Sequence, residues 1–185
     1  MNLSLLDVFV LSLLDRGLKT PYSLQREGGL SLGATTPSLR RLSSARLVTR
    51  GDFENATRRP RHEYRLTSAG RKALLTGWRE HFDKIRIASD LDSVLRLVDL
   101  AVHYGAKRDE IGVFLKRAAE QRFSRAHRAE TLISPDHDSF SYQQTRWQCE
   151  SARLEAEASV LSRLATEFQS QPHQRTARVK LGTRK

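Results

Sequence analysis

The spacing of hydrophobic and polar residues predicts that the chain begins with three short helices. Residues 3 to 15 place leucines and valines on one broad helical face. A second short helix is expected over residues 20 to 27, and a third over residues 33 to 46. Gly28 and Gly29 make the turn between the last two. This order of helices is typical of the helix-turn-helix arrangement.

The third predicted helix has a narrow apolar face and a broad polar one. At about 100° per residue, Leu39 and Leu42 fall on one face, so the helix is expected to pack on a neighbour rather than inside a core. The opposite face collects small, hydroxyl and guanidinium groups, namely Gly33, Thr36, Pro37, Arg40, Arg41 and Ser44. A solvated amphipathic helix would show the same pattern, and this alternative stays open for the helix taken alone.

Two strands follow this helix. They are expected over residues 47 to 54 and 61 to 66, joined by a loop whose cationic residues are Arg58, Arg59 and Arg61. A polar, cationic helix beside a cationic hairpin suits double-stranded DNA, because the helix enters the major groove while the hairpin crosses the neighbouring backbone. The sequence therefore predicts a winged helix that binds duplex DNA.

Individual contacts follow from side-chain chemistry. Arg40 and Arg41 are candidates for guanine, because a guanidinium matches the O6/N7 edge with two hydrogen bonds. Arg41 has phosphate as an alternative, since it lies nearer the flank. The wing arginines are expected on phosphates or in the minor groove. The other candidate DNA contacts are Thr36, Pro37, Ser38, Ser44, Tyr22 and Arg26, and for Tyr22 a place in the core stays open.

The segments GLSLGATTPSLRRLSSARLV and RRPRHEYRLTSAGRKAL resemble the PadR family of winged-helix repressors over about residues 3 to 80. The matching positions are Pro37, Leu39 and Leu42 in the helix, Arg59, Pro60 and Arg61 in the wing, and Tyr64, Leu66, Thr67 and Gly70 after it. The resemblance implies transcriptional repression, with release by a small-molecule effector or another signal.

Three positions depart from the family pattern. Thr35 stands where Leu or Ile usually fills the core, which weakens packing slightly. Thr36 replaces a tyrosine that faces the groove, which implies a different base preference. Arg46 replaces a glycine that commonly ends the helix in the left-handed conformation, so the end of the helix is undefined by a residue or two.

The second half reads as a helical bundle that pairs two copies of the chain. The last helix, residues 140 to 169, repeats a heptad seam of Trp147, Ser151, Leu154, Ala158, Leu161, Ala165 and Phe168. With the apolar helix that carries Leu91 and Val98, this seam is the expected joint of a homodimer. The predicted division is a DNA-binding domain at 1–88, a helical dimerisation or effector domain at 89–171 and a basic, disordered tail at 172–185.

The net charge of +11 is unevenly placed. Residues 1 to 88 carry 16 Lys+Arg against 8 Asp+Glu, residues 89 to 171 carry 11 against 13, and residues 172 to 185 carry 5 against none. A positive first half favours a polyanion such as nucleic acid. An anionic membrane surface fits less well, because no basic amphipathic helix with a broad apolar face accompanies the charge. No apolar run approaches the roughly 18 residues of a transmembrane helix.

Other chemistry has weaker support. Asp136, His137 and Asp138 are the only cluster that resembles metal ligands, and neighbours on one loop rarely converge on one ion. Nothing indicates a catalytic triad or a cofactor site. The single cysteine, Cys149, fits a reducing cytoplasm. We therefore expect no enzyme activity, cofactor or metal. The alternatives are an architectural DNA-binding protein with little sequence preference and, third, a metal-dependent enzyme that uses the Asp136–Asp138 loop.

Overall fold

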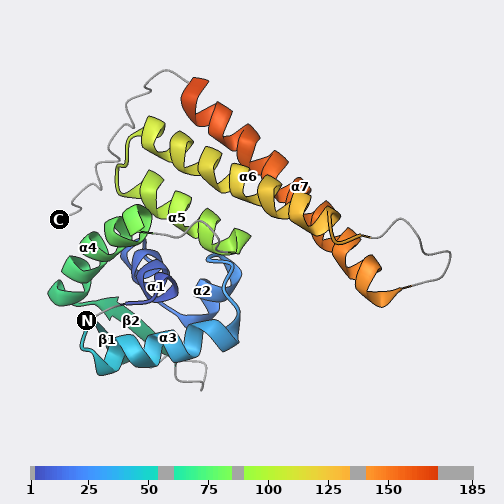
Figure 1. The fold of residues 1–185 in the computed structure, drawn as a ribbon. Helices are drawn as coiled ribbons and strands as arrows, with labels where there is room; N and C mark the ends of the chain where they lie inside the picture. The colour runs from blue at the N-terminus through green and yellow to red at the C-terminus, as the bar shows by residue number, and fades with distance from the viewer. Residues whose placement is uncertain (1–2, 54–60, 85–89, 134–140, 171–185) are drawn as a thin grey trace. The chain divides into compact units, whose positions relative to one another are not determined.

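The computed structural model describes residues 3–53, 61–84, 90–133 and 141–170, and the chain forms two compact units. The N-terminal unit (Met1–Ala106) is a mainly helical winged helix with a two-stranded antiparallel sheet, as the sequence predicts. It contains α1 (Leu5–Asp15), α2 (Pro21–Arg26), α3 (Leu32–Ser44), β1 (Val48–Phe53), β2 (Arg61–Leu66), α4 (Ser68–Lys84) and α5 (Leu91–His103). The C-terminal unit (Lys107–Lys185) contains α6 (Arg108–Glu130) and α7 (Tyr142–Ser170) (Figure 1).

The core of the N-terminal unit forms around α1. Val8, Val10 and Leu11 are fully buried, and α1 contacts α3, α4, α5 and β2. Ser4 caps the helix, because its hydroxyl accepts a hydrogen bond from the backbone N–H of Asp7 at 3.1 Å. Since a fully buried Leu or Val stabilises a fold by roughly 1.5–3 kcal/mol, α1 holds the other elements of the unit together.

Side-chain caps and glycines fix the turn that leads into α3. Thr20 and Ser23 form a capping box at the start of α2, each side chain accepting from the other residue's backbone N–H at 3.1 Å. Gly29 has φ +66°, a left-handed conformation that favours glycine. A Cβ on Gly28 would lie 2.5 Å from the carbonyl oxygen of Leu24. The turn between α2 and α3 is therefore closely specified by its glycines.

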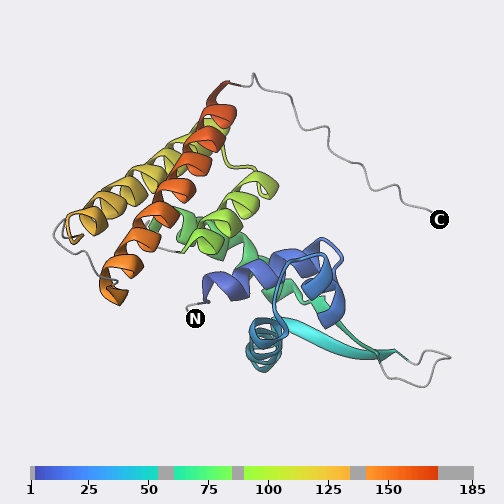
Figure 2. The same ribbon diagram turned by 90° about the vertical axis from the view of Figure 1, so that its right-hand side faces the viewer.

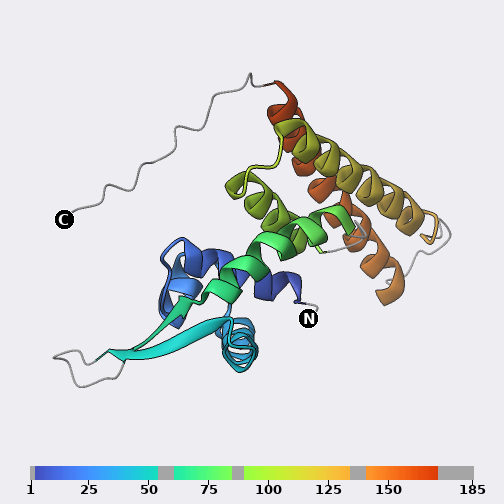
Figure 3. The same ribbon diagram turned by 90° about the vertical axis from the view of Figure 1, so that its left-hand side faces the viewer.

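The wing is a regular antiparallel pair. Its register pairs Val48 with Leu66 and Arg50 with Tyr64, close to the strand limits that the sequence predicts. Within the N-terminal unit, the two strands extend away from the helices (Figure 2 and Figure 3). The Tyr64 backbone N–H donates to the carbonyl of Lys19 at 2.8 Å, so the segment before α2 holds the base of the wing.

The exit from the wing explains two of the residues that match the family pattern. The hydroxyl of Thr67 contacts the Leu47 carbonyl at 3.0 Å and accepts from the Gly70 N–H at 3.0 Å. A side chain at Gly70 would overlap the Leu47 carbonyl. The start of α4 is thereby locked against the start of β1.

Arg46 takes the left-handed conformation that glycine usually supplies. Its φ is +56°. The Arg46 N–H donates to the Ser43 carbonyl and the Leu47 N–H donates to the Leu42 carbonyl, both at 2.9 Å. This is the Schellman arrangement. It defines the end of α3, which the sequence leaves open, at a cost in backbone strain that a glycine would avoid.

The helix α5 belongs to the N-terminal unit. The boundary between the units therefore lies between residues 106 and 107, whereas the sequence analysis placed it after residue 88. Leu97 and Leu100 are fully buried, and α5 packs on α1 and α4. Asp99 pairs with Arg16 of α1 at 2.6 Å. The Tyr104 ring stacks on Trp78 of α4, with centroids 6.2 Å apart. Periodicity shows that α5 has an apolar face but does not show which neighbour covers it.

The helices α6 and α7 form an antiparallel hairpin. The predicted seam of α7 faces α6 of the same chain, which leaves Leu154 2% and Leu161 0% exposed. The expectation that these two leucines join a second copy is therefore wrong, because the hairpin already covers them. Trp147 and Phe168, at the two ends of the seam, and Leu91 and Val98 of α5 are only partly buried.

Arg122 occupies a buried position of α6 that the pattern of apolar residues does not mark. It is 3% exposed, and its Nε donates to Oε2 of Glu157 on α7 at 2.7 Å. Phe123, whose spacing suggests the apolar side, is 46% exposed instead. A paired guanidinium thus sits in the seam of the hairpin, and the neighbouring aromatic ring lies outside it.

Candidate nucleic-acid interface

The outer surface of α3 carries the polar side chains that the sequence places there. We call Thr36, Pro37, Arg40, Arg41 and Ser44 the α3 face, and all five are exposed. The inner side packs against the core, with Leu39 2% and Leu42 0% exposed. Ser31 caps the helix by accepting from the Ala34 N–H at 3.2 Å. The predicted division of α3 into a packed side and a polar side is confirmed.

Pro37 lies within α3, at its sixth residue, and not in the first turn. Because proline has no N–H, the carbonyl four residues earlier loses its helical donor. That carbonyl belongs to Gly33, which is exposed. Water can therefore satisfy it, which explains how the helix tolerates a proline on this side.

Ser38 does not reach the surface. It is 0% exposed, and its Oγ donates to Oδ1 of Asp7 on α1 at 2.6 Å. The expectation that Ser38 contacts DNA is therefore wrong, because its hydroxyl is used inside the unit to join α3 to α1.

Arg41 is fastened to the same carboxylate. Its Nη2 donates to Oδ1 of Asp7 at 2.7 Å and its Nε to Oδ2 at 3.3 Å, while 52% of its side chain stays exposed. Burial raises the pKa of Asp7, but hydrogen bonds from Arg41, Ser38 and Ser4 outweigh it and leave the pKa below its ordinary value. The hydrogen bond and charge of Asp7 raise the pKa of Arg41. Arg41 is a fully charged group held at the edge of the α3 face.

Arg40 lies near the middle of the α3 face. Among the residues that the structure describes, none forms an ion pair or a hydrogen bond with its guanidinium. Its five N–H donors are therefore open to an external acceptor. Arg40 and Arg41 are neighbours in sequence, yet one is unrestrained and the other is fixed by Asp7.

The helix α2 contributes two exposed polar groups. Tyr22 is 65% exposed, so the alternative that places it in the core is wrong. Its phenol oxygen accepts from Nη1 of Arg26 at 3.5 Å, one turn along the helix. Both side chains stand on a surface of the helix-turn-helix segment and are available to a partner.

The wing tip that the sequence singles out lies largely outside the described residues. This holds for Arg58 and Arg59, whereas Arg61 begins β2. The strands carry two further arginines that sequence reasoning did not single out. Nη2 of Arg50 lies 2.6 Å from Nε2 of His62, and Arg65 pairs with Glu63 at 3.6 Å. The alternation of side chains along a strand would have indicated both positions.

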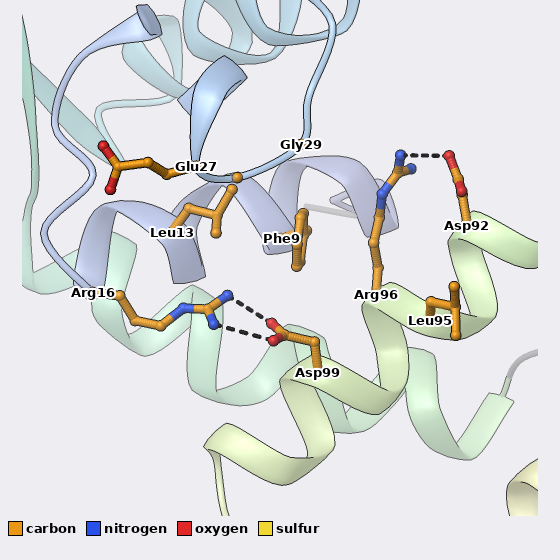
Figure 4. Close-up of a pocket in the computed structure, with 10 residues that line it drawn as sticks. Phe9, Leu13, Arg16, Glu27, Gly29, Asp92, Leu95, Arg96 and Asp99 are labelled. Carbon is orange, nitrogen blue, oxygen red and sulfur yellow. Dashed lines mark hydrogen bonds and ion pairs between the residues drawn. The ribbon is translucent and has the colours of Figure 1, made fainter. Parts of the chain in front are cut away.

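A cavity of about 300 Å³ lies between α1, the α2–α3 turn and α5 of the N-terminal unit (Figure 4). The guanidinium groups of Arg16 and Arg96 lie 6.0 and 5.9 Å from the centre of the Phe9 ring. Each arginine is also paired with a carboxylate of α5, Asp99 at 2.6 Å and Asp92 at 3.2 Å. Sequence reasoning missed this site because its residues come from three separate segments.

The described residues hold no group of three or more His, Cys, Asp or Glu side chains arranged to bind a metal ion. The predicted candidates Asp136, His137 and Asp138 lie outside those residues. Cys149 is exposed on α7. None of the helices in the described part of the chain is both long and apolar enough to cross a membrane.

No protein-family model matches the sequence, and no curated protein matches it. Two solved structures resemble the chain along most of its length. The crystal structure of Bacillus subtilis PadR in complex with operator DNA is 19% identical, with 90% of this chain and 98% of that chain covered and a TM-score of 0.42. A Streptococcus mutans protein is 18% identical, with 85% and 96% covered and a TM-score of 0.39. Both likenesses are distant in sequence and in superposition.

Proposed function

We propose that this chain is a dimeric, sequence-specific transcriptional regulator that binds duplex DNA. It acts in the cytoplasm as a repressor of the PadR type and is released by a small-molecule effector or another signal. The observation that carries the proposal is the α3 face. A winged helix presents one exposed helix to the major groove, and here that helix carries hydroxyls and two arginines on its outer side.

The residues of the α3 face contact different parts of the duplex. Arg40, whose guanidinium has no hydrogen-bond or ion-pair partner among the described residues, binds the edge of a guanine. Thr36, Pro37 and Ser44 supply the remaining contacts of the helix to bases and sugar-phosphate. Arg41, held at the edge of the face, contacts a phosphate.

The rest of the N-terminal unit positions that helix on the duplex. Tyr22 and Arg26 of α2 contact the backbone beside the groove. Arg58, Arg59 and Arg61 of the wing reach phosphates or the minor groove. Residues 1 to 88 carry 16 Lys+Arg against 8 Asp+Glu, and this excess of +8 supplies attraction that does not depend on sequence.

Two copies are needed for adequate specificity, because one winged helix covers a single half-site. Leu154 and Leu161 are already covered within the hairpin, so the joint uses other apolar groups of the long helices. Val113 is 44%, Phe123 46% and Val160 41% exposed. On the C-terminal unit, partly buried Trp147 and Phe168 are further candidates for this joint. On the N-terminal unit, partly buried Leu91 and Val98 of α5 are separate candidates.

The cavity beside Phe9 is the candidate effector site. A molecule bound there would touch α1 and the turn before α3 at once (Figure 4). To bind the ligand, Arg16 would have to release Asp99, and Arg96 would have to release Asp92. Such an exchange couples ligand binding to the position of α3, which a regulator released by a signal requires.

Selection of duplexes from a randomised pool, followed by binding titrations, tests the proposal. We expect a selected pseudo-palindrome to bind far more tightly than a scrambled duplex. If about four to six phosphates are neutralised per half-site, the log–log salt slope is about −4 to −5 for each half. Equal affinity for selected and scrambled duplexes would favour the architectural alternative, and a slope near zero would exclude both DNA-binding functions.

A further inference from the structure

The carboxylate of Asp7 on α1 bonds to one buried and one exposed residue of α3. Asp7 lies among fully buried residues of α1 and is itself 4% exposed. It accepts from Ser38 at 2.6 Å and from Arg41 at 2.7 and 3.3 Å. A buried carboxylate without such partners would cost several kcal/mol, so its presence in an otherwise apolar helix requires an explanation in α3.

The two partners of Asp7 stand one turn apart on α3 and have opposite exposure. Ser38 is enclosed, whereas the Arg41 side chain is 52% exposed. The hydrogen bonds use the Nε–Nη2 edge of the guanidinium, so the Nη1–Nη2 edge stays open for a second acceptor. Asp7 thus holds Arg41 by one edge and leaves the other available.

We infer that Asp7 is a positioning residue for DNA binding, which fixes α3 on α1 and orients Arg41 as a phosphate clamp. This inference rests on the proposed function and deepens it. A guanidinium fixed at the edge of the α3 face cannot extend to a base in the middle of the groove without leaving Asp7. Arg41 therefore contributes equally to all duplexes, and sequence choice falls to Arg40.

If Asp7 acted only through its charge, its removal would change DNA affinity in the opposite direction from the positioning role. Asp7 neutralises part of the positive field, so removing its charge would tighten DNA binding and make the salt slope steeper. In the positioning role, removal frees the Arg41 side chain, and ordering it again on the phosphate costs affinity. The direction of the change therefore separates the two accounts.

The experiment compares the full-length wild type with Asp7→Asn, Arg41→Ala and the double variant. Each is titrated with a selected and a scrambled duplex well below its unfolding temperature. We expect Asp7→Asn to weaken binding about tenfold on both duplexes and to make the salt slope shallower. In the Arg41→Ala background, Asp7→Asn should cause no further loss, because the two residues act as a unit.

Two further variants keep the test decisive if Asp7→Asn folds poorly. Ser38→Ala removes a hydrogen bond from the same carboxylate but leaves the Arg41 pair, so it should lower the midpoint of thermal unfolding without changing the salt slope. Arg41→Lys keeps the charge but cannot bridge Asp7 and a phosphate in the same way. We expect it to lose about fivefold in affinity.

The result that overturns the inference is specific. Unchanged or tighter binding by Asp7→Asn, additive losses in the double variant, or full affinity in Arg41→Lys would each remove the positioning role while leaving the proposed function intact. If the wild type binds neither duplex, the proposed function itself fails, and the variants are not needed to show it.

Discussion

The helices α3 and α6 are both rich in arginine, yet their arginines are used in different ways. On α6, Arg122 is buried against Glu157 at 2.7 Å, and Arg125 lies 3.6 Å from Glu150. On α3, Arg40 has no partner among the described residues and Arg41 is held by Asp7. Charge that is paired across a hairpin stabilises the hairpin, whereas charge that faces outward is available to a polyanion.

The same contrast appears in the charge of each half of the chain. Residues 89 to 171 carry 11 Lys+Arg against 13 Asp+Glu, while residues 1 to 88 carry 16 against 8. The number of arginines therefore says little about DNA binding until their partners are known. Changes to charged residues of the hairpin should therefore alter its stability, whereas changes on the α3 face should alter DNA binding.

The largest effect is expected from Leu154→Glu combined with Leu161→Glu. Each substitution buries a charge between α6 and α7, so together they should cost more than about 5 kcal/mol and unfold the hairpin. Helix content should fall in circular dichroism, and sedimentation equilibrium should show loss of the proposed dimer or aggregation.

Val160→Glu is the matched control, because it places the same charge one residue away on a 41% exposed position. It should leave the hairpin folded. If it removes the dimer without loss of helix, Val160 is part of the joint. A double variant of Leu154 and Leu161 that stays folded and dimeric would contradict the packing of α7 on α6.

Breaking the buried pair of the hairpin should have the next largest effect. Glu157→Gln leaves Arg122 buried beside a neutral amide, and loss of one partner of a buried pair costs about 3–5 kcal/mol. Thermal or urea unfolding measures this loss in the free energy of unfolding. Glu155→Gln, on the exposed side of α7, should change stability by less than about 0.5 kcal/mol. Neither change should alter the DNA affinity of the folded protein by direct contact.

Arg40→Ala should cost roughly 1–3 kcal/mol on a selected duplex and relax the choice of sequence. Arg59→Ala should weaken all duplexes more evenly and make the salt slope shallower by about one. Arg163→Ala removes the same charge from an exposed position of α7 and should change neither quantity. Equal losses for Arg40→Ala on selected and scrambled duplexes would show that Arg40 does not read a base.

The contribution of Asp7 to stability should depend on pH. Because its pKa is lowered in the folded chain, the contribution is present above the ordinary carboxyl pKa of 3.8 and is lost as pH falls through the folded value. At neutral pH, Asp7→Asn should cost about 1–2 kcal/mol in the free energy of unfolding. Urea titrations from neutral to acid pH should show wild type and variant converging, and a constant difference would contradict the lowered pKa.

The smallest effect, and the only gain, is expected from Arg46→Gly. The residue has φ +56°, which costs a non-glycine residue roughly 1–2 kcal/mol. Part of that gain is offset by the greater freedom of glycine in the unfolded chain, so we expect about 0.5–1 kcal/mol of added stability. Arg46→Ala is the control, since it removes the charge but keeps the Cβ and should show no such gain in thermal unfolding.

Local chemistry made much of the N-terminal unit predictable. Capping side chains, the glycine turn and the alternation of apolar positions are enough to identify α1, α2, α3 and the wing from the order of residues. The polar residues of α3 could be assigned to its outer side, because Leu39 and Leu42 determine which side packs. The tyrosine of α2 could not be placed in the same way, since one aromatic residue on a six-residue helix fits either environment.

Other outcomes depended on which elements meet in space. Periodicity identified the seam of α7 but not its partner, and the partner is α6 rather than a second copy. It also chose Phe123 for the packed side of α6, where the hairpin instead holds Arg122, because an arginine can be buried once Glu157 faces it. Ser38 was a candidate DNA contact because of its hydroxyl, although helical phase ranked it lower, and in the folded chain that hydroxyl donates to Asp7.

The order of residues was sufficient to determine the type and succession of the elements, the winged-helix class and the polar character of the α3 face, since these depend on residues close together in the chain. Tertiary packing decided that α5 joins the N-terminal unit, that Leu154 and Leu161 are internal, and that Arg41 is fixed while Arg40 is not. Asp7 and Arg41 are 34 positions apart, and Arg122 and Glu157 are 35 apart. Pairings over such separations depend on how helices pack, and a one-dimensional pattern does not record that.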